Sequence, residues 1–258
     1  MDVSAKDQRV LVTAGGAGIG RAIAKTFLEH GARVPVCDVD ERALKELKKQ
    51  HPAISQSVAD VASVADVERL FDDVKRHLGG LDVLVNNAGI AGPTAKVEDV
   101  KPEDWDRCIA VDISGMFYCT RKAMPMLKAA GGGSIINLSS IAGRFGFAMR
   151  TPYSAAKWAV VGFTQSLAVE AGPDRVRVNC IQPGVVEGER VDRVIDAKAK
   201  TLGVSFDEIK NRMLAGVAMH TTVTAQDIAN TALFLATEAG RHISGQAISV
   251  CGGARYLV

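Results

Sequence analysis

The chain has 258 residues, of which 47% are hydrophobic and 23% charged, with a formal net charge of +2. This composition supports a sizeable folded core and excludes wholesale disorder, and so small a positive excess disfavours a nucleic-acid partner. No apolar run is long enough to span a membrane, and residues 1–8 lack the apolar segment of a signal peptide. The five cysteines are scattered without metal-ligand spacing, so we expect a reduced, cytoplasmic protein without a metal site or a membrane partner.

Short apolar runs alternate with helical patterns along the whole chain. We predict strands near residues 9–13, 34–38, 54–58, 81–85, 134–138, 176–181 and 246–250. The spacing of apolar residues predicts helices through Ile23 to Leu28 and near 41–50, 64–78, 101–110, 115–128, 153–171 and 225–236. The strand at 34–38 contains Pro35, which cannot donate to a ladder.

This alternation implies parallel strands joined by right-handed crossovers. We therefore expect an α/β fold with one doubly wound parallel sheet of about seven strands and helices on both faces. No Pro/Ser-rich linker or internal repeat divides the chain, which predicts a single domain over residues 1–258. The polar stretch 187–219 is interpreted as a helical insertion that forms a substrate loop.

A glycine-rich turn follows the first predicted strand. It contains Gly15, Gly18, Ile19 and Gly20, and the next helix begins there. Glycines let the backbone pass close to a diphosphate, and the free N–H groups at the helix start face the anion. The pattern favours dinucleotide binding in a Rossmann-like fold over a purely structural turn.

Asp38 ends the second predicted strand, eighteen residues after Gly20. A carboxylate there can accept hydrogen bonds from the adenosine ribose hydroxyls, and it would repel a 2′-phosphate. Two like charges a few Å apart near a surface cost on the order of 2–4 kcal/mol, which predicts NAD rather than NADP as cofactor. The alternative is that Asp38 caps the next helix, but Asp40 is an equally good candidate for that cap.

Two Tyr-x-x-x-Lys pairs occur, Tyr118/Lys122 and Tyr153/Lys157. On a helix this spacing places both side chains on one face, where the ammonium lowers the pKa of the phenol and makes it a better acid–base group. Ser140 lies thirteen residues before Tyr153, whereas Trp105 occupies that position before Tyr118. A serine hydroxyl can hydrogen-bond a reacting oxygen, so we assign catalysis to Ser140, Tyr153 and Lys157. The other pair is interpreted as a packing or surface pair.

Further motifs accompany this triple: Asp60-Val61, Asn86-Asn87-Ala88-Gly89 and Pro183-Gly184. With them the chain resembles the short-chain dehydrogenase/reductase family over its whole length. The resemblance implies hydride transfer between a nicotinamide and a carbonyl or secondary alcohol. Tyr153 would be the general acid–base, Ser140 would steady the substrate oxygen, and Lys157 would hold the nicotinamide ribose and tune Tyr153. The remaining implied cofactor contacts are Asp60 and Val61 beside the adenine, Asn87, Ala88 and Gly89 after the fourth strand, Pro183 and Gly184, and the backbone of Val186 at the carboxamide.

Three positions depart from the family pattern. Ala14 replaces the first motif glycine, and Gly188 stands where a threonine commonly holds the carboxamide. Asp112 replaces the frequent catalytic asparagine, which supports a water relay to the lysine. The resemblance therefore implies a catalytic role for Asp112, whose charge changes the relay's pH dependence.

The substrate is expected to contact the loops at 91–97, 141–151 and 187–219. Arg144, Arg150 and Arg190 on these loops are candidates to hold a carboxylate, which favours a small polar substrate such as a sugar acid, for example a 2-keto-3-deoxy sugar acid, or a hydroxy acid. The alternative for each arginine is a solvated or ion-paired surface residue, and Phe145 and Phe147 favour an aliphatic substrate instead.

Two other functions stay open. One is a 3-oxoacyl thioester (acyl-carrier-protein) reductase, an enzyme that usually needs NADPH, against which Asp38 argues. The other is a catalytically silent nucleotide-sensing protein, against which the intact Ser140, Tyr153 and Lys157 argue. The resemblance also implies a homotetramer.

Overall fold

The computed structural model describes residues 3–257, so the first two residues of the stretch tested for a signal peptide lie outside the described part. Within it, seven parallel strands form one sheet in the order β3-β2-β1-β4-β5-β6-β7. The strands are β1 (Val10–Thr13), β2 (Pro35–Asp38), β3 (Ser55–Val58), β4 (Val83–Asn86), β5 (Gly133–Leu138), β6 (Val176–Pro183) and β7 (Ala247–Val250). The predicted doubly wound α/β sheet is confirmed.

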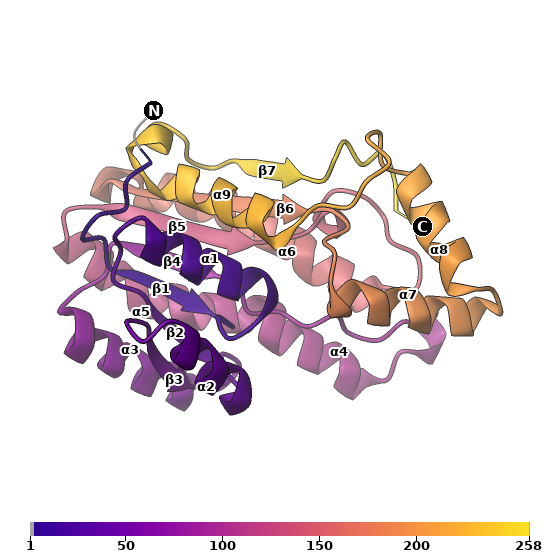
Figure 1. Ribbon diagram of the computed structural model, residues 1–258, viewed down its shortest axis with the longest axis horizontal. Helices are drawn as coiled ribbons and strands as arrows, with labels where there is room; N and C mark the ends of the chain where they lie inside the picture. The colour runs from indigo at the N-terminus through magenta and orange to yellow at the C-terminus, as the bar shows by residue number, and fades with distance from the viewer. Residues whose placement is uncertain (1–2, 258) are drawn as a thin grey trace.

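Helices cover both faces of this sheet (Figure 1). The described α-helices are α1 (Gly18–Glu29), α2 (Glu41–Gln50), α3 (Val64–Leu78), α4 (Pro102–Ile109), α5 (Gly115–Ala129), α6 (Thr151–Ala171), α7 (Glu189–Leu202), α8 (Phe206–Ala215) and α9 (Ala225–Ala236). The buried residues of α1, α2 and α9 share one apolar cluster, and those of α3, α5 and α6 share another. These two clusters are the cores on the two faces of the sheet.

The central strands β1 and β4 are mainly apolar and buried along their whole length, because helices cover both faces of the sheet. In β1, Val10 and Val12 pack into the first cluster, while Leu11 packs into the second. β4 alternates in the same way, with Val83 and Val85 opposite Leu84. Successive side chains of a strand point to opposite faces, so one short apolar run contributes to both cores.

Two local predictions about β2 and α2 hold. Pro35 is the first residue of β2, a position where a missing N–H donor is tolerated. Asp40 caps α2, since its carboxylate accepts hydrogen bonds from the N–H groups of Arg42 and Ala43. The carboxylate of Asp38 is therefore not needed as the cap.

The segment between the fourth and fifth strands differs from the prediction. α4 and α5 are joined without a break by η2 (Ala110–Ser114), a π-helical turn, where two separate helices were expected. A π-turn adds one residue to the local repeat and is frequent at functional sites. Here it directs Asp112 into the interior, where the residue is 1% exposed.

The predicted insertion at 187–219 forms α7 and α8, which lie at the end of the sheet toward which the strand arrows point (Figure 1). A third apolar cluster, which includes Ile195 and Ile209, joins these helices to Ile141 and Val185. The insertion is thus packed over the carboxyl ends of the strands.

All five cysteines are buried and free within the described residues, and burial raises the pKa of Cys37 to about 12 and of Cys108 to about 11. These thiols are protonated and structural rather than reactive. Residues 3–257 contain no helix that is long and apolar enough to span a membrane. Nor do these residues bring three or more His, Cys, Asp or Glu side chains together as metal ligands.

Candidate active site

The strand order reverses between β1 and β4, and ligands of open α/β sheets bind at such a point. Two polar side chains join the turns that follow these strands. The Oγ1 atom of Thr13 accepts hydrogen bonds from the N–H groups of Asn87 and Ala88, and the Asn87 amide donates to the carbonyls of Thr13 and Ala14. The glycine turn and the loop at 87–89 therefore form one rigid surface.

The glycine turn leaves no space for side chains where it crosses the sheet. A Cβ on Gly20 would lie 2.1 Å from the carbonyl oxygen of Ala14, and one on Gly15 would lie 2.6 Å from Cβ of Val36. Gly18 has a φ of +52°, and no described atom lies within 4 Å of where its Cβ would be. The first turn of α1 has no side-chain cap and no acidic residue. Its N–H groups therefore face an accessible surface that fits a diphosphate.

Ala14 is the exception in this turn. Its φ is +49°, in the left-handed region that favours glycine. The turn accommodates the alanine in a strained backbone conformation.

Asp38 lies beside the glycine turn. Its Oδ2 accepts a hydrogen bond from the Gly16 N–H at 3.0 Å, and its Oδ1 accepts one from the Asp40 N–H at 3.1 Å. These two bonds hold the carboxylate at the end of β2. Asp60 and Val61 follow the end of the next strand, β3. Oδ2 of Asp60 pairs with Arg107 at 2.9 Å. Val61 is buried against Gly115 at the start of α5. This arrangement fits the adenosine half of a nicotinamide dinucleotide.

Tyr153 and Lys157 lie one turn apart near the start of α6. Lys157 is buried; its Nζ donates to the carbonyl of Leu138 at 3.0 Å and lies 5.6 Å from the centre of the Tyr153 ring. Ser140 follows β5, and its Oγ accepts a hydrogen bond from the Ala142 N–H. Ser139 holds the same turn of α6, because its hydroxyl donates to the carbonyl of Lys157.

Asp112 completes this group. Its Oδ2 lies 3.5 Å from Nζ of Lys157, and its Oδ1 accepts a 2.6 Å hydrogen bond from the Ile90 N–H. A Cβ on Gly89 would lie 3.1 Å from Nζ of Lys157, so the loop after β4 also closes against the lysine. The structure thus brings Asp112, Lys157, Tyr153 and the loop at 87–90 together.

The second Tyr-x-x-x-Lys pair lies elsewhere. Nζ of Lys122 pairs with Glu68 of α3 at 2.9 Å, and the Tyr118 ring packs beside Phe117 and the apolar cluster of that face. This environment agrees with the interpretation as a packing and surface pair.

The β6 end borders the site on its other side. Pro183 ends β6, and a Cβ on Gly184 would lie 2.7 Å from Cα of Cys251. Val186 forms a parallel bridge with Val223, and Gly188 has a φ of +128°. The chain then enters α7. Gly188, which stands where the family commonly has a threonine, therefore lies at the start of the insertion.

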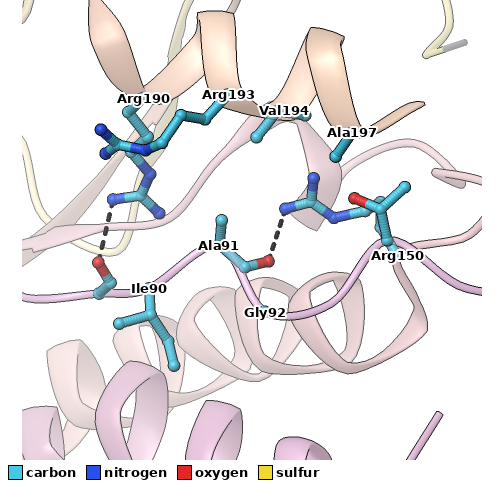
Figure 2. A pocket seen from close by; sticks show the side chains of 10 residues that line it. Ile90, Ala91, Gly92, Arg150, Arg190, Arg193, Val194 and Ala197 are labelled. Atoms are coloured by element: carbon cyan, nitrogen blue, oxygen red, sulfur yellow. Dashed lines mark hydrogen bonds between the residues drawn. The ribbon is translucent and has the colours of Figure 1, made fainter. Parts of the chain in front are cut away.

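A cavity of about 490 Å³ lies between the loop at 89–94 and α7 (Figure 2). Its basic lining residues are Arg150, Arg190 and Arg193. Arg190 reaches down from α7 to donate to the Gly89 carbonyl at 3.0 Å, and Arg150 donates to the Ala91 carbonyl at 2.5 Å (Figure 2). Two of the three predicted arginines therefore line one cavity. Arg144 is not in its lining; it donates to Ser249 and lies over the ring of Phe145.

Arg150 is 2% exposed, and its guanidinium carbon lies 5.2 Å from the centre of the Tyr153 ring. Burial lowers the pKa of Arg150, and its Nε and Nη1 have no hydrogen-bond partner. An anion is the partner that such a group lacks. Sequence reasoning found Arg150 but missed Lys198, which is also buried and unpartnered. Nothing in the pattern of α7 marks it, since lysines on charged helices are usually solvated.

The chain was compared with known proteins. A family model described as enoyl-(acyl carrier protein) reductase matches residues 13–255. A 3α-hydroxysteroid dehydrogenase from Mediterraneibacter gnavus is 34% identical, covering 97% of this chain and 98% of its own. The 3-oxoacyl-[acyl-carrier-protein] reductase FabG of Chlamydia muridarum is 35% identical, covering 96% of this chain and 97% of its own.

Solved structures give the same architecture. An NAD⁺-bound xylitol dehydrogenase superposes with a TM-score of 0.92 at 26% identity, covering 98% of this chain and 100% of that one. A variant of actinorhodin polyketide ketoreductase with NADPH superposes with a TM-score of 0.90 at 32% identity, covering 95% and 96%.

Proposed function

Because the chain belongs to the short-chain dehydrogenase/reductase family, we propose that it transfers a hydride between NAD and a small secondary alcohol or ketone that carries a carboxylate. Membership of this family shows that the protein is an oxidoreductase that acts on alcohols and ketones. We propose in addition that the cofactor is NAD and that the substrate carries a carboxylate.

The residues of the site supply the proton chemistry. A bound nicotinamide accepts the hydride in oxidation and supplies it in reduction. The Tyr153 hydroxyl takes the proton from the alcohol in oxidation and returns it to the carbonyl oxygen in reduction. Lys157, whose Nζ lies 5.6 Å from the centre of the Tyr153 ring, would hold the nicotinamide ribose. The Ser140 hydroxyl donates a hydrogen bond to the substrate oxygen. Asp112 positions Lys157 through the ion pair between them.

NAD is proposed over NADP because of Asp38. Its carboxylate is fixed beside the glycine turn by the N–H groups of Gly16 and Asp40. In the same region Arg21, the first cation after the turn, pairs with Gln50. A 2′-phosphate would face a fixed negative charge without a free arginine in the turn to offset it.

The substrate class rests on one observation: Arg150 is buried beside Tyr153 with two unpartnered nitrogens, and it lines the same cavity as Arg190. A carboxylate within reach of these guanidiniums would place the adjoining carbinol carbon near the tyrosine. Hydroxy acids and sugar acids, including 2-keto-3-deoxy sugar acids, have this chemistry.

The second candidate is a 3-oxoacyl thioester reductase. The FabG relative and the description of the matching family model support it. Asp38 argues against it, because such reductases usually use NADPH. A silent nucleotide sensor is the third and weakest candidate, since the catalytic side chains are all present.

The test follows reduced-nicotinamide absorbance with NAD and NADP in parallel. Substrates are hydroxy acids, sugar acids, neutral sugars, aliphatic alcohols and 3-hydroxyacyl thioesters. Turnover with NAD on carboxylated alcohols is expected. Turnover with NADP on the thioesters would put the reductase first, and NAD binding without turnover of any alcohol would favour the sensor.

We also propose one domain over residues 1–258, with 187–219 as the substrate insertion, in a cytoplasmic homotetramer. The continuous sheet supports the single domain. Exposed apolar residues on α5 and α6, among them Phe117, Trp158 and Val169, support an interface on that face. Sedimentation of the purified protein tests the assembly.

A further inference from the structure

Two buried cations lie next to the active site without counter-charges. Arg150 is 2% exposed and Lys198 is 4% exposed. Neither forms an ion pair within the described residues. Lys198 Nζ and two of the Arg150 nitrogens have no hydrogen-bond partner. Burial, with the positive charge of Arg150, lowers the pKa of Lys198.

Both side chains lie against the ring of Phe147. Nζ of Lys198 is 5.0 Å from the ring centre, and the guanidinium carbon of Arg150 is 5.4 Å from it. Arg150 in turn lies over Tyr153. The chain at Met149, one residue before Arg150, has a φ of +65°, a strained conformation in the loop that carries Phe147 and Arg150. The loop and α7 thus hold two cations on one aromatic ring, beside the catalytic tyrosine.

Three neighbouring carboxylates are already in ion pairs. Asp112 faces Lys157, and on α7 Glu189 pairs with Arg193 and Asp196 with Lys200. A cation–π contact offsets only a small part of the desolvation of a buried charge. A buried, mutually repelling pair is therefore best explained by an anion that binds between them.

Lys198 also belongs to the helix face that borders the cavity. Val194 and Ala197 of α7 line the cavity, and Lys198 follows them at the next position of that face. With Arg190 and Arg193 at the rim, the cavity and its border contribute four cations. Of the carboxylates on α7, those of Glu189 and Asp196 are in ion pairs, and Asp192 is exposed.

We propose that Arg150 and Lys198 form one oxyanion site and that the substrate of this enzyme carries two negative charges at that end. A phosphate monoester and a dicarboxylate share this chemistry. Lys198 is then a specificity-determining residue that a single-carboxylate substrate does not require. The inference deepens the proposed function, since it names the charge of the substrate for the same site.

Binding is measured without cofactor or turnover. Thermal unfolding of the full chain is followed in inorganic phosphate, succinate, acetate and chloride at equal ionic strength. We expect phosphate, succinate or both to raise the Tm more than acetate or chloride. A rise with phosphate alone that Lys198→Met abolishes points to a phosphate ester, and a rise with succinate alone points to a dicarboxylate. A rise with phosphate that Lys198→Met retains would assign binding to the glycine turn and overturn the proposal. Equal Tm values in all four anions would overturn the proposal.

Lys198→Met is the decisive variant, and Lys200→Met is its matched control on the same helix. Lys200 is exposed and paired with Asp196, so its replacement removes the same charge outside the site. Lys198→Met should bind the dianion about 10- to 100-fold more weakly, while Lys200→Met stays within about threefold of wild type. An unchanged affinity in Lys198→Met, or an equal loss in both variants, would refute a local site.

The ligand-free Tm gives an independent readout. Methionine fits the buried stem of Lys198 and removes an unpartnered buried charge, so Lys198→Met should unfold at a higher temperature than wild type in chloride. A lower Tm would mean that the lysine is internally satisfied and is no anion site. These outcomes are separate from the proposed function, which fails if no alcohol is turned over with NAD, whatever the anions do.

Discussion

The Nζ atom of Lys157 lies 3.5 Å from Oδ2 of Asp112, and the two side chains are only 4% and 0% exposed. The π-turn between α4 and α5 makes this contact possible, because it directs Asp112 inward at the level of the lysine. The other carboxylate oxygen binds the Ile90 N–H. One aspartate thus couples Lys157 to the loop that follows β4.

The role of Asp112 is tested by Asp112→Asn and Asp112→Ala. Both variants remove the counter-charge of Lys157. Asparagine keeps an acceptor for the Ile90 N–H and a polar oxygen beside the lysine, whereas alanine leaves both groups without a partner. Breaking a buried pair by removing one partner costs about 3–5 kcal/mol. We expect Asp112→Ala to lose that stability in urea unfolding and most of kcat, and Asp112→Asn to lose much less of both. Equal losses in the two variants would contradict the positioning role.

Tyr153→Phe should lower kcat by about 100- to 10,000-fold, because it removes the acid–base hydroxyl. NAD affinity, measured by fluorescence or calorimetry, should change little. Tyr118→Phe is the control, since it removes the same hydroxyl from the other Tyr-x-x-x-Lys pair and should retain full activity. A Tyr153→Phe enzyme with wild-type turnover would disprove the assignment.

Asp38→Ser should shift the ratio of NADP to NAD efficiency toward NADP by on the order of 30- to 1,000-fold, the equivalent of removing like-charge repulsion of about 2–4 kcal/mol. Asp40→Ser removes the same charge two residues away while serine still caps α2. It should leave the cofactor ratio unchanged. Values of kcat/KM with both cofactors measure the shift, and a ratio that moves equally in both variants would assign it to general surface charge.

Ala14→Gly should stabilise the protein by roughly 0.5–1 kcal/mol, because glycine adopts a positive φ without the steric cost that alanine bears. Ala65→Gly, at an exposed position in α3, should destabilise by about 1 kcal/mol, the ordinary cost of glycine in a helix. Opposite signs in denaturant unfolding would confirm the strain at Ala14. Destabilisation by both variants would refute it.

The ion pair between Asp82 and Arg9 should make the stability of the fold depend on pH. Burial alone would raise the pKa of Asp82, but the hydrogen bonds from the side chain and backbone of Arg9 outweigh it and lower that pKa. A carboxyl whose folded pKa is depressed stabilises the fold above its unfolded value, near 4, and this contribution disappears as the pH falls through the folded pKa. The Tm difference between wild type and Asp82→Asn should therefore be largest near pH 6 and shrink toward pH 3. A constant difference across that range would contradict the ion pair.

Much of the fold followed from local patterns. The strands at 10–13, 83–86 and 133–138 were predicted within one or two residues, because apolar runs bounded by turn residues have few other stable conformations. The π-turn at 110–114 was not predicted. The apolar pattern of an α-helix and that of a helix with a short π-helical turn are the same in the sequence. Only the packing around Asp112 distinguishes the two conformations.

For the site, sequence spacing was enough where the chemistry is local. Tyr153 and Lys157 are one helical turn apart, and Asp38 and Gly16 meet because they end adjacent strands. Sequence spacing could not tell which of the arginines lines the cavity. Arg144 and Arg150 lie on one loop, yet one contacts Ser249 and the other is buried in the cavity wall.

By itself, the sequence predicted the sheet with its helices, the glycine turn after β1, and Tyr153 and Lys157 one helical turn apart, because periodicity and fixed spacing act over a few residues. Only the tertiary structure decided which charges are left without partners. Lys198 is distant in sequence from Arg150, and its neighbours on α7 are ordinary charged residues. Whether a cation is solvated or buried depends on which elements pack over it. Arg150 and Lys198 lose their water only where α7 packs against the loop at 147–150, and this desolvation is what favours an anion there.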